Sequence, residues 1–121
     1  MVRRRVQRLN EQLRRELTEI LRREVKDPRV GLVTVTGVRV APDLTFARVL
    51  VEIPSSADEP ETLAGLAAAA PFVRHELGQH LRIRRVPELR FEADHTLDHA
   101  RHIERLLGEA LNHQDEEADD A

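Results

Sequence analysis

The chain contains no cysteine. Disulfide bonds, cysteine-ligated zinc and thiol catalysis are therefore excluded. No apolar run approaches the about 20 residues that a membrane-spanning helix needs. The basic N-terminus lacks the apolar stretch that follows it in a signal peptide. We therefore expect a cytoplasmic protein with no membrane partner.

Aromatic side chains are almost as scarce, because the chain has no tryptophan, no tyrosine and only three phenylalanines. Phe46, Phe72 and Phe91 all fall within apolar patterns, which predicts that they lie in the core. Proteins that bind single-stranded nucleic acid often stack bases on exposed aromatic rings. Without such rings, any binding of RNA is expected to depend on phosphate contacts and on RNA shape.

Catalytic and ligand-binding signatures are also missing. No glycine-rich phosphate loop occurs, and Ser55 and Ser56 have no histidine nearby in the sequence. His95, His99 and His102 are spaced so that one helical face could hold a divalent metal. A solvated polar face is the interpretation we favour for them. We therefore expect no enzyme activity, no metal or other cofactor, and no small-molecule substrate.

Charge is unevenly distributed, although the formal net charge is only −3. Residues 1–26 carry nine basic side chains and four glutamates, whereas the last seven residues carry five acids and no base. A basic face beside an acidic tail favours a polyanionic partner. Surface ion pairs are the alternative explanation of the basic groups. The candidate RNA-binding residues are Arg3, Arg4, Arg5, Arg8, Lys26, Arg29, Arg74, Arg82, Arg84, Arg85 and Arg90.

The pattern of apolar residues predicts an α+β fold. Steps of three and four predict a helix over residues 5–25, which Pro28 ends by about Lys26. Alternating residues predict an antiparallel hairpin, with Gly37 at a bulge. The remaining predicted elements are strands at 32–40 and 45–53, helical segments on both sides of Pro71, a strand within 82–93 and a helix over 97–111.

These elements fit a three-stranded sheet with helices packed on one face. In the third strand, Ile83, Leu89 and Phe91 are expected on one side, and Arg82, Arg84 and Arg90 on the other. Residues 1–111 are predicted to form a single RNA-binding domain, and residues 112–121 a disordered acidic tail. We expect a monomer.

Several long segments resemble one known family. They are "VKDPRVGLVTVTGVRVAPDLTFARVLV" (Val25–Val51), "PFVRHELGQHLRIRRVPELRFEAD" (Pro71–Asp94) and "HIERLL" (His102–Leu107), preceded by "RV" at the start of the first helix. Together they cover nearly the whole body of the chain, which resembles bacterial ribosome-binding factor A.

The resemblance implies a type II KH-like fold and a non-enzymatic role. It implies binding to the immature small (30S) ribosomal subunit, late maturation and 5′-end processing of 16S rRNA, and importance in the cold. Family members carry an Ala-x-Gly kink between two helices, where this chain has Ala69-Ala70-Pro71. Proline also breaks a helix, so a kink is expected here. The alternative is a protein-interaction module without direct RNA contact, which would use the hairpin edge or the last helix.

Overall fold

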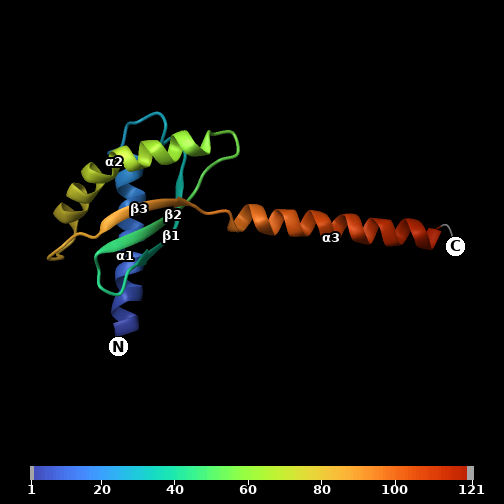
Figure 1. The fold of residues 1–121 in the computed structure, drawn as a ribbon, viewed down its shortest axis with the longest axis horizontal. Coiled ribbons are helices and arrows are strands. Elements are labelled where there is room, and N and C mark those ends of the chain that lie inside the picture. Colours follow the sequence, from blue (N-terminus) through green and yellow to red (C-terminus); the bar gives the residue numbers. More distant parts are fainter. Residues whose placement is uncertain (1, 120–121) are drawn as a thin grey trace.

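The computed structural model describes residues 2–119, as three helices and one three-stranded sheet (Figure 1). This order confirms the predicted α+β fold; the finer type II KH-like classification stays a prediction. The elements are α1 (Val2–Arg23), β1 (Thr34–Val40), β2 (Phe46–Glu52), α2 (Glu59–His80), β3 (Glu88–Ala93) and α3 (Thr96–Asp119).

Helix α1 is amphipathic and packs one face against the sheet. Leu13 and Leu17 on that face are fully buried. The helix ends at Arg23, slightly before the end predicted near Lys26. Pro28 disfavours helical angles in the residue before it, so the chain turns away at this point.

The sheet has the order β1-β2-β3, with the predicted antiparallel hairpin β1–β2 and with β3 parallel to β2. The pairing register shifts between Val35 and Gly37, which confirms the predicted bulge. An extra residue reverses the alternation of the two sides along a strand. Val35, Val38 and Val40 are therefore all buried. In a regular strand Val35 and Val38, which are three positions apart, would lie on opposite sides of the sheet.

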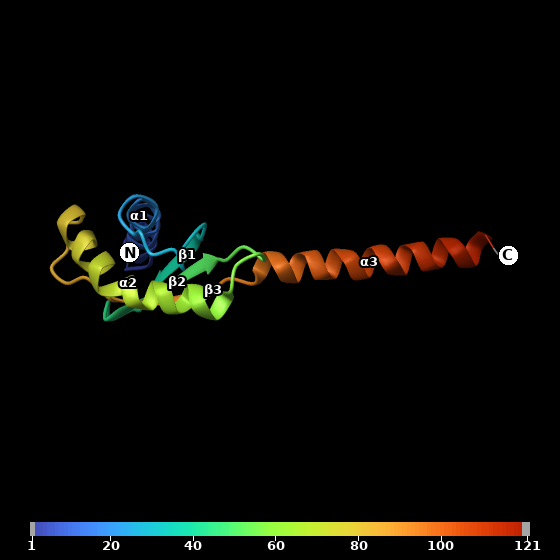
Figure 2. The ribbon, with the colours of Figure 1, turned by 90° about the horizontal axis from the view of Figure 1, so that it is seen from above.

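Helix α2 is continuous through Pro71. The sequence predicted two helical segments around this proline, and they form one helix whose ribbon changes direction between its two halves (Figure 2). Proline bends a helix because it lacks an N–H and its ring crowds the preceding turn. At the other end, Asp58 caps the helix by accepting a 3.0 Å hydrogen bond from the Glu61 N–H.

Strand β3 lies within the predicted range 82–93 and begins at Glu88. Arg82 and Arg84 therefore lie in the α2–β3 loop, which corrects their assignment to the strand. The cause is Pro87, which has no N–H to donate to a neighbouring strand. The Glu88 N–H donates a hydrogen bond to the carbonyl oxygen of Thr45, the residue before β2, at 2.9 Å.

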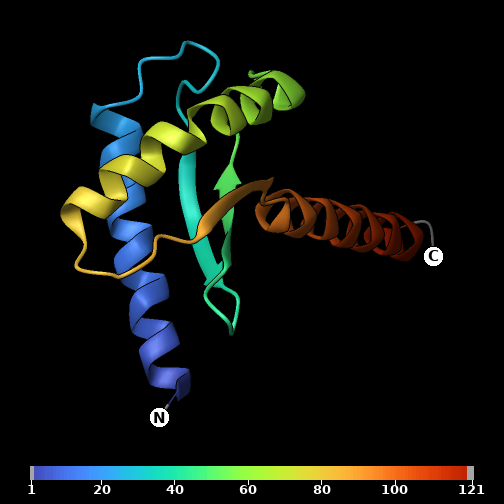
Figure 3. The same ribbon diagram turned by 60° about the vertical axis from the view of Figure 1, so that its left-hand side comes forward.

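Helices α1 and α2 both lie on one side of the sheet, where the core is formed (Figure 3). Val49 and Val51 of the central strand are fully buried there, as are Leu66 and Val73 of α2. Side chains on the other side of the sheet are exposed or half-buried. We call this second side the open face.

Helix α3 leaves the end of β3 and projects away from the other elements (Figures 1 and 2). It continues to Asp119, further than the predicted end at residue 111. Ile103, Leu106, Leu107 and Leu111 on this helix are between 43% and 61% exposed. The division into a domain over 1–111 and an acidic tail over 112–121 stays a prediction.

The assignment of all three phenylalanines to the core was wrong. Phe91 packs against the core, but Phe72 is 43% exposed. Successive residues of an α-helix are rotated by about 100°, so the neighbour of a buried residue can lie outside the buried face. Val73 takes the buried position, and Phe72 is consequently turned outward.

Candidate nucleic-acid interface

The predicted RNA-binding side chains do not form one cluster. They lie near the start of α1, in the α1–β1 turn, along α2 and its following loop, and on β3. Helix α1 has 22 residues and is therefore about 33 Å long. Arg5 lies near the start of this helix and Arg29 lies beyond its end, so the two are too far apart to hold the same phosphate group.

The start of α1 carries Arg4, Arg5 and Arg8, all exposed. Within residues 2–119 these three make no ion pair, whereas Arg14 and Arg15 further along both pair with Glu11. The first turn contains no acidic residue. Cations near a helix N-terminus are unfavourable because the helix dipole is positive there. Helix stability therefore does not explain why arginines occupy these positions. Binding of an external anion would explain them. Arg3 is also in α1, but its side chain lies outside the described part.

In the α1–β1 turn, Arg29 serves the fold. Its Nε and Nη2 donate to the two carboxylate oxygens of Asp27, at 3.1 and 2.7 Å, and its backbone N–H donates to Asp27 Oδ1 at 2.9 Å. These side-chain hydrogen bonds lower the pKa of Asp27. A Cβ on Gly65 of α2 would lie only 2.9 Å from the Arg29 Cβ. Lys26, by contrast, is exposed and makes no ion pair within the described chain.

Arg74 also has a structural contact. Its Nε donates to the Pro87 carbonyl oxygen at 3.1 Å, and its Nη2 donates to the Val86 carbonyl oxygen at 2.8 Å. Arg74 thereby ties the α2–β3 loop to α2. The same loop presents three exposed arginines that form no ion pair in the part of the chain described, namely Arg82, Arg84 and Arg85.

The bend of α2 presents an aromatic ring that the sequence had assigned to the core. At the predicted kink Ala69 and Ala70 are half-buried, while Pro71 and Phe72 are exposed. An exposed ring can stack on a nucleobase. The expectation that stacking is absent therefore loses its basis. No decisive sequence signal predicted this exposure, because adjacent apolar residues of a helix can both be buried, as Ile20 and Leu21 are.

Arg90 lies on the open face beside two arginines that the sequence analysis did not select. Arg39 of β1 pairs in register with Arg48 of β2, and Arg48 pairs with Arg90 of β3. In β2, Ala47 and Val49 are buried, and the alternation places Arg48 on the opposite, polar side. The position of Arg39 depends on the bulge and on strand register. Neither can be recognised from clusters of basic residues in the sequence.

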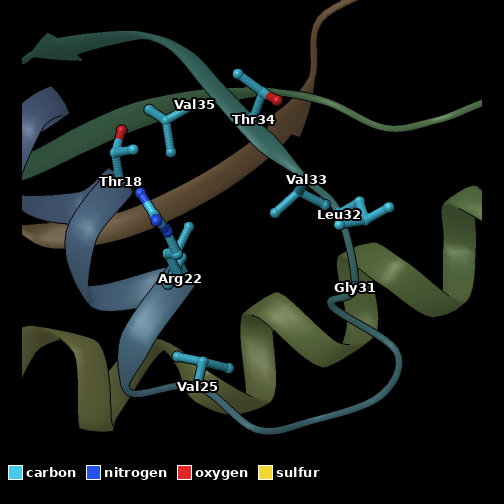
Figure 4. Close-up of a pocket in the computed structure, with 9 residues that line it drawn as sticks. Thr18, Arg22, Val25, Gly31, Leu32, Val33, Thr34 and Val35 are labelled. Carbon is cyan, nitrogen blue, oxygen red and sulfur yellow. The ribbon is translucent and has the colours of Figure 1, made fainter.

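A groove of about 490 Å³ lies between the end of α1 and the start of β1 (Figure 4). Its walls are mainly apolar, with polar atoms from Thr18, Arg22 and Thr34, and Leu32 on its rim is 87% exposed. No carboxylate, histidine or serine lines it. The groove therefore offers no pair of groups for general acid–base or nucleophilic catalysis.

His95, just before α3, and His99 and His102 on α3 are all exposed. His95 Nε2 lies 3.2 Å from Glu59 Oε1, and His95 Nδ1 lies 3.7 Å from Asp98 Oδ2. Among residues 2–119, no group of three or more histidine, aspartate or glutamate side chains could hold a metal ion. No helix in the described part is long and apolar enough to cross a membrane.

Comparison with known proteins decides the family. The model of the family "ribosome-binding factor A" matches residues 5–107. The chain belongs to the ribosome-binding factor A family. The first residues of α1 and the last part of α3 lie outside the matched region.

Solved structures of the family have a similar fold. The crystal structure of ribosome-binding factor A from Thermus thermophilus is 33% identical, with a TM-score of 0.68, and the match covers 73% of this chain and 93% of that one. A Thermus thermophilus homology model, fitted into a cryo-EM map of a complex of the 30S subunit with ribosome-binding factor A, is 33% identical over 70% of this chain and 90% of that one, with a TM-score of 0.60. The solution structure of a putative ribosome-binding factor A from Thermotoga maritima is 28% identical over 69% of this chain and 84% of that one, with a TM-score of 0.55.

Proposed function

We propose that this chain binds the immature 30S ribosomal subunit and promotes late maturation and 5′-end processing of its 16S rRNA. The observation that carries the proposal is the family match over residues 5–107. It is supported by the Thermus relative, whose homology model was fitted into the map of a 30S complex. The role is non-enzymatic, and the protein acts as a cytoplasmic monomer without cofactor or small-molecule substrate.

Contact with rRNA rests on the arginines that have no protein partner. The guanidinium group matches a phosphate with two parallel hydrogen bonds, and such charge-assisted bonds are stronger than neutral ones. Arg82, Arg84 and Arg85 are exposed on one loop, and Arg74 holds that loop against α2. Phe72 adds a surface for stacking a base that is unpaired in folded RNA.

Binding of this kind stabilises one arrangement of the rRNA until maturation proceeds. A misfolded RNA leaves its trapped state by crossing a barrier, and the rate falls exponentially as the barrier becomes large relative to thermal energy. Trapped rRNA is therefore longer-lived in the cold. A factor that favours the productive arrangement is correspondingly most needed at low temperature.

Sucrose-gradient sedimentation with separated ribosomal subunits tests the proposal. The protein should migrate with the 30S subunit, more strongly with immature than with mature particles, and not with the 50S subunit. Migration with neither subunit at low salt would overturn the proposal.

Two variants with the same change in net charge test the role of the loop. Replacing Arg82, Arg84 and Arg85 with glutamine should weaken 30S binding at least tenfold, because unpaired cations are removed. The matched control replaces Arg14, Arg15 and Arg23, which are ion-paired with glutamates of α1, and should change binding much less. Equal binding by the loop variant and the parent protein would instead favour a protein-interaction module without direct RNA contact.

A further inference from the structure

Three arginines form a straight row across the open face. Arg39, Arg48 and Arg90 lie directly opposite one another on β1, β2 and β3. All three side chains are exposed. Adjacent strands are about 4.8 Å apart, so the outer two arginines of the row are separated by about 10 Å at the backbone.

The bulge in β1 creates this row. Before it, Thr34 and Thr36 are exposed and Val35 is buried. With strict alternation, Arg39 would share the buried side with Val35. The register shift between Val35 and Gly37 moves Arg39 to the open face, opposite Arg48. The bulge therefore brings a third positive charge into line with the other two.

Like charges placed directly opposite on neighbouring strands are destabilising, so the contacts that offset their repulsion are informative. Arg48 Nη2 lies 2.7 Å from Glu92 Oε2. Arg90 lies over the ring of Phe46, with its Cζ 4.0 Å from the ring centroid, and its Nε is 3.8 Å from Glu88 Oε1. Both guanidinium groups are thus held by protein contacts on the open face.

Arg39 is the exception in the row. It makes no ion pair within residues 2–119, and its side chain is exposed. The two glutamates on this face contact only two of the three arginines, Arg48 and Arg90, so the β1 end of the row keeps an uncompensated positive charge. The residue directly opposite Arg39 on the neighbouring strand is another arginine, Arg48. An external anion placed here would relieve the repulsion that the strand pairing imposes.

The shape and charge of the open face favour a polyanion with regularly spaced charges. A row about 10 Å long spans a few successive phosphates of one nucleic-acid strand. Neither α1 nor α2 covers the face (Figure 3). Glu52 lies four residues beyond Arg48 along β2, which corresponds to about 13 Å. This acidic end of the sheet disfavours an RNA strand that runs along β2 and favours one that runs across the strands, along the row.

We propose that the arginine row is a second RNA-binding surface, on the side of the sheet opposite the helices, so that one protein molecule contacts two segments of rRNA at once. The proposal rests on the proposed 30S binding. The first segment contacts the arginines of α1 and of the α2–β3 loop. The second lies across Arg39, Arg48 and Arg90 on the open face.

Hydroxyl-radical footprinting of 16S rRNA in immature 30S particles tests this proposal with three charge-matched variants. The row variant replaces Arg39, Arg48 and Arg90 with glutamine, the loop variant replaces Arg82, Arg84 and Arg85, and the control replaces Arg14, Arg15 and Arg23. Row and loop variants should each lose a different set of protected nucleotides while keeping the other set. The control should keep both sets.

The outcomes are distinguishable. A row variant with an unchanged footprint and unchanged affinity would overturn the second surface and leave the proposed function standing. A parent protein that protects no 16S nucleotides would overturn the proposed function itself. Loss of the same nucleotides by both variants would show one shared surface and would also contradict the proposal.

A single variant separates lost contact from lost folding. Arg39→Gln should bind immature 30S particles about threefold or more weakly, while its melting temperature stays equal or rises because the repulsion from Arg48 is removed. Weaker binding accompanied by a lower melting temperature would mean that Arg39 supports the fold, and would count against the second surface.

Discussion

At the scale of single residues, the arginines of this chain differ by what their guanidinium groups contact. Arg29 and Arg74 are held by Asp27 and by loop carbonyl groups, and they fix the α1–β1 turn and the α2–β3 loop. Arg39 and Arg82 make no ion pair in residues 2–119. Charge alone did not separate these two groups in the sequence, because the difference lies in contacts made after folding.

Two glycines of α2 should respond oppositely to the same substitution. A Cβ at Gly65 would lie 2.9 Å from the Arg29 Cβ, which is tighter than packed atoms allow. Gly65→Ala should therefore lower the free energy of unfolding by about 1–3 kcal/mol. At Gly78 the nearest atom outside the helix is 3.5 Å away, so Gly78→Ala should raise it by up to about 1 kcal/mol. Urea denaturation measures both. An equally stable Gly65→Ala variant would show that α2 and the turn are not tightly packed.

Asp94 links the start of α3 to the sheet and should make stability depend on acidic pH. Thr36 Oγ1 donates to its Oδ2 at 2.6 Å, and the Thr96 N–H donates to its Oδ1 at 2.9 Å. These bonds lower the pKa of Asp94 from 3.8 to about 2. Because the folded pKa lies below the unfolded one, the stabilisation is complete above about pH 4 and is lost as the pH falls toward 2.

The measurement compares the parent protein with Asp94→Asn, which keeps a hydrogen-bond acceptor but removes the charge. Urea denaturation at a series of pH values should show the parent more stable at pH 6, with a difference that shrinks between pH 4 and pH 2. A difference that stays constant over this range would contradict the charged hydrogen bonds to Thr36 and Thr96.

At the scale of elements, local patterns predicted what local forces determine. Helix α1 and the β1–β2 hairpin follow directly from apolar spacing, and the bulge at Gly37 was visible as a slip in alternation. Strand β3 lies within its predicted range, but Arg82 and Arg84 were wrongly placed on it, because pairing begins only after Pro87. The kink at Pro71 was predicted from the proline itself, and the two helical segments around it form one helix.

The candidate site was less predictable than the fold. The predicted RNA-binding residues included Arg90 but not Arg39 or Arg48, because the row depends on the bulge in β1 and on the pairing of the hairpin with β3, which is distant in the sequence. Phe72 was assigned to the core instead of the site, because its exposure depends on which of two adjacent apolar residues faces the core.

The start of α1 offers a prediction in which stability and binding change in opposite directions. Arg4, Arg5 and Arg8 face the positive end of the helix dipole without an acidic partner in the first turn. Replacing them with glutamine should raise the free energy of unfolding by a few tenths of a kcal/mol and weaken 30S binding several-fold. Urea denaturation and sedimentation measure the two effects. Weaker binding is the decisive result, and unchanged binding would remove this cluster from the interface.

At the scale of the whole molecule, a net charge of −3 is compatible with RNA binding because acids and bases are separated. Among the described residues, arginines without an ion pair include those at the start of α1, on the α2–β3 loop and at the β1 end of the open face. Acidic residues are concentrated after residue 114, in the C-terminal part of the chain.

Charge-driven binding to 30S particles is most directly tested by the salt dependence of the dissociation constant. Each phosphate contact contributes about 0.7 to 0.9 to the slope of log affinity against log salt concentration. If the α1, loop and open-face arginines contact rRNA, the affinity for immature 30S particles should fall about a hundredfold or more between 50 and 200 mM salt. Arg39→Gln, which removes the one cation of the row that makes no ion pair within the described residues, should lower the slope by about one. An affinity that stays flat across this range would contradict phosphate-based binding.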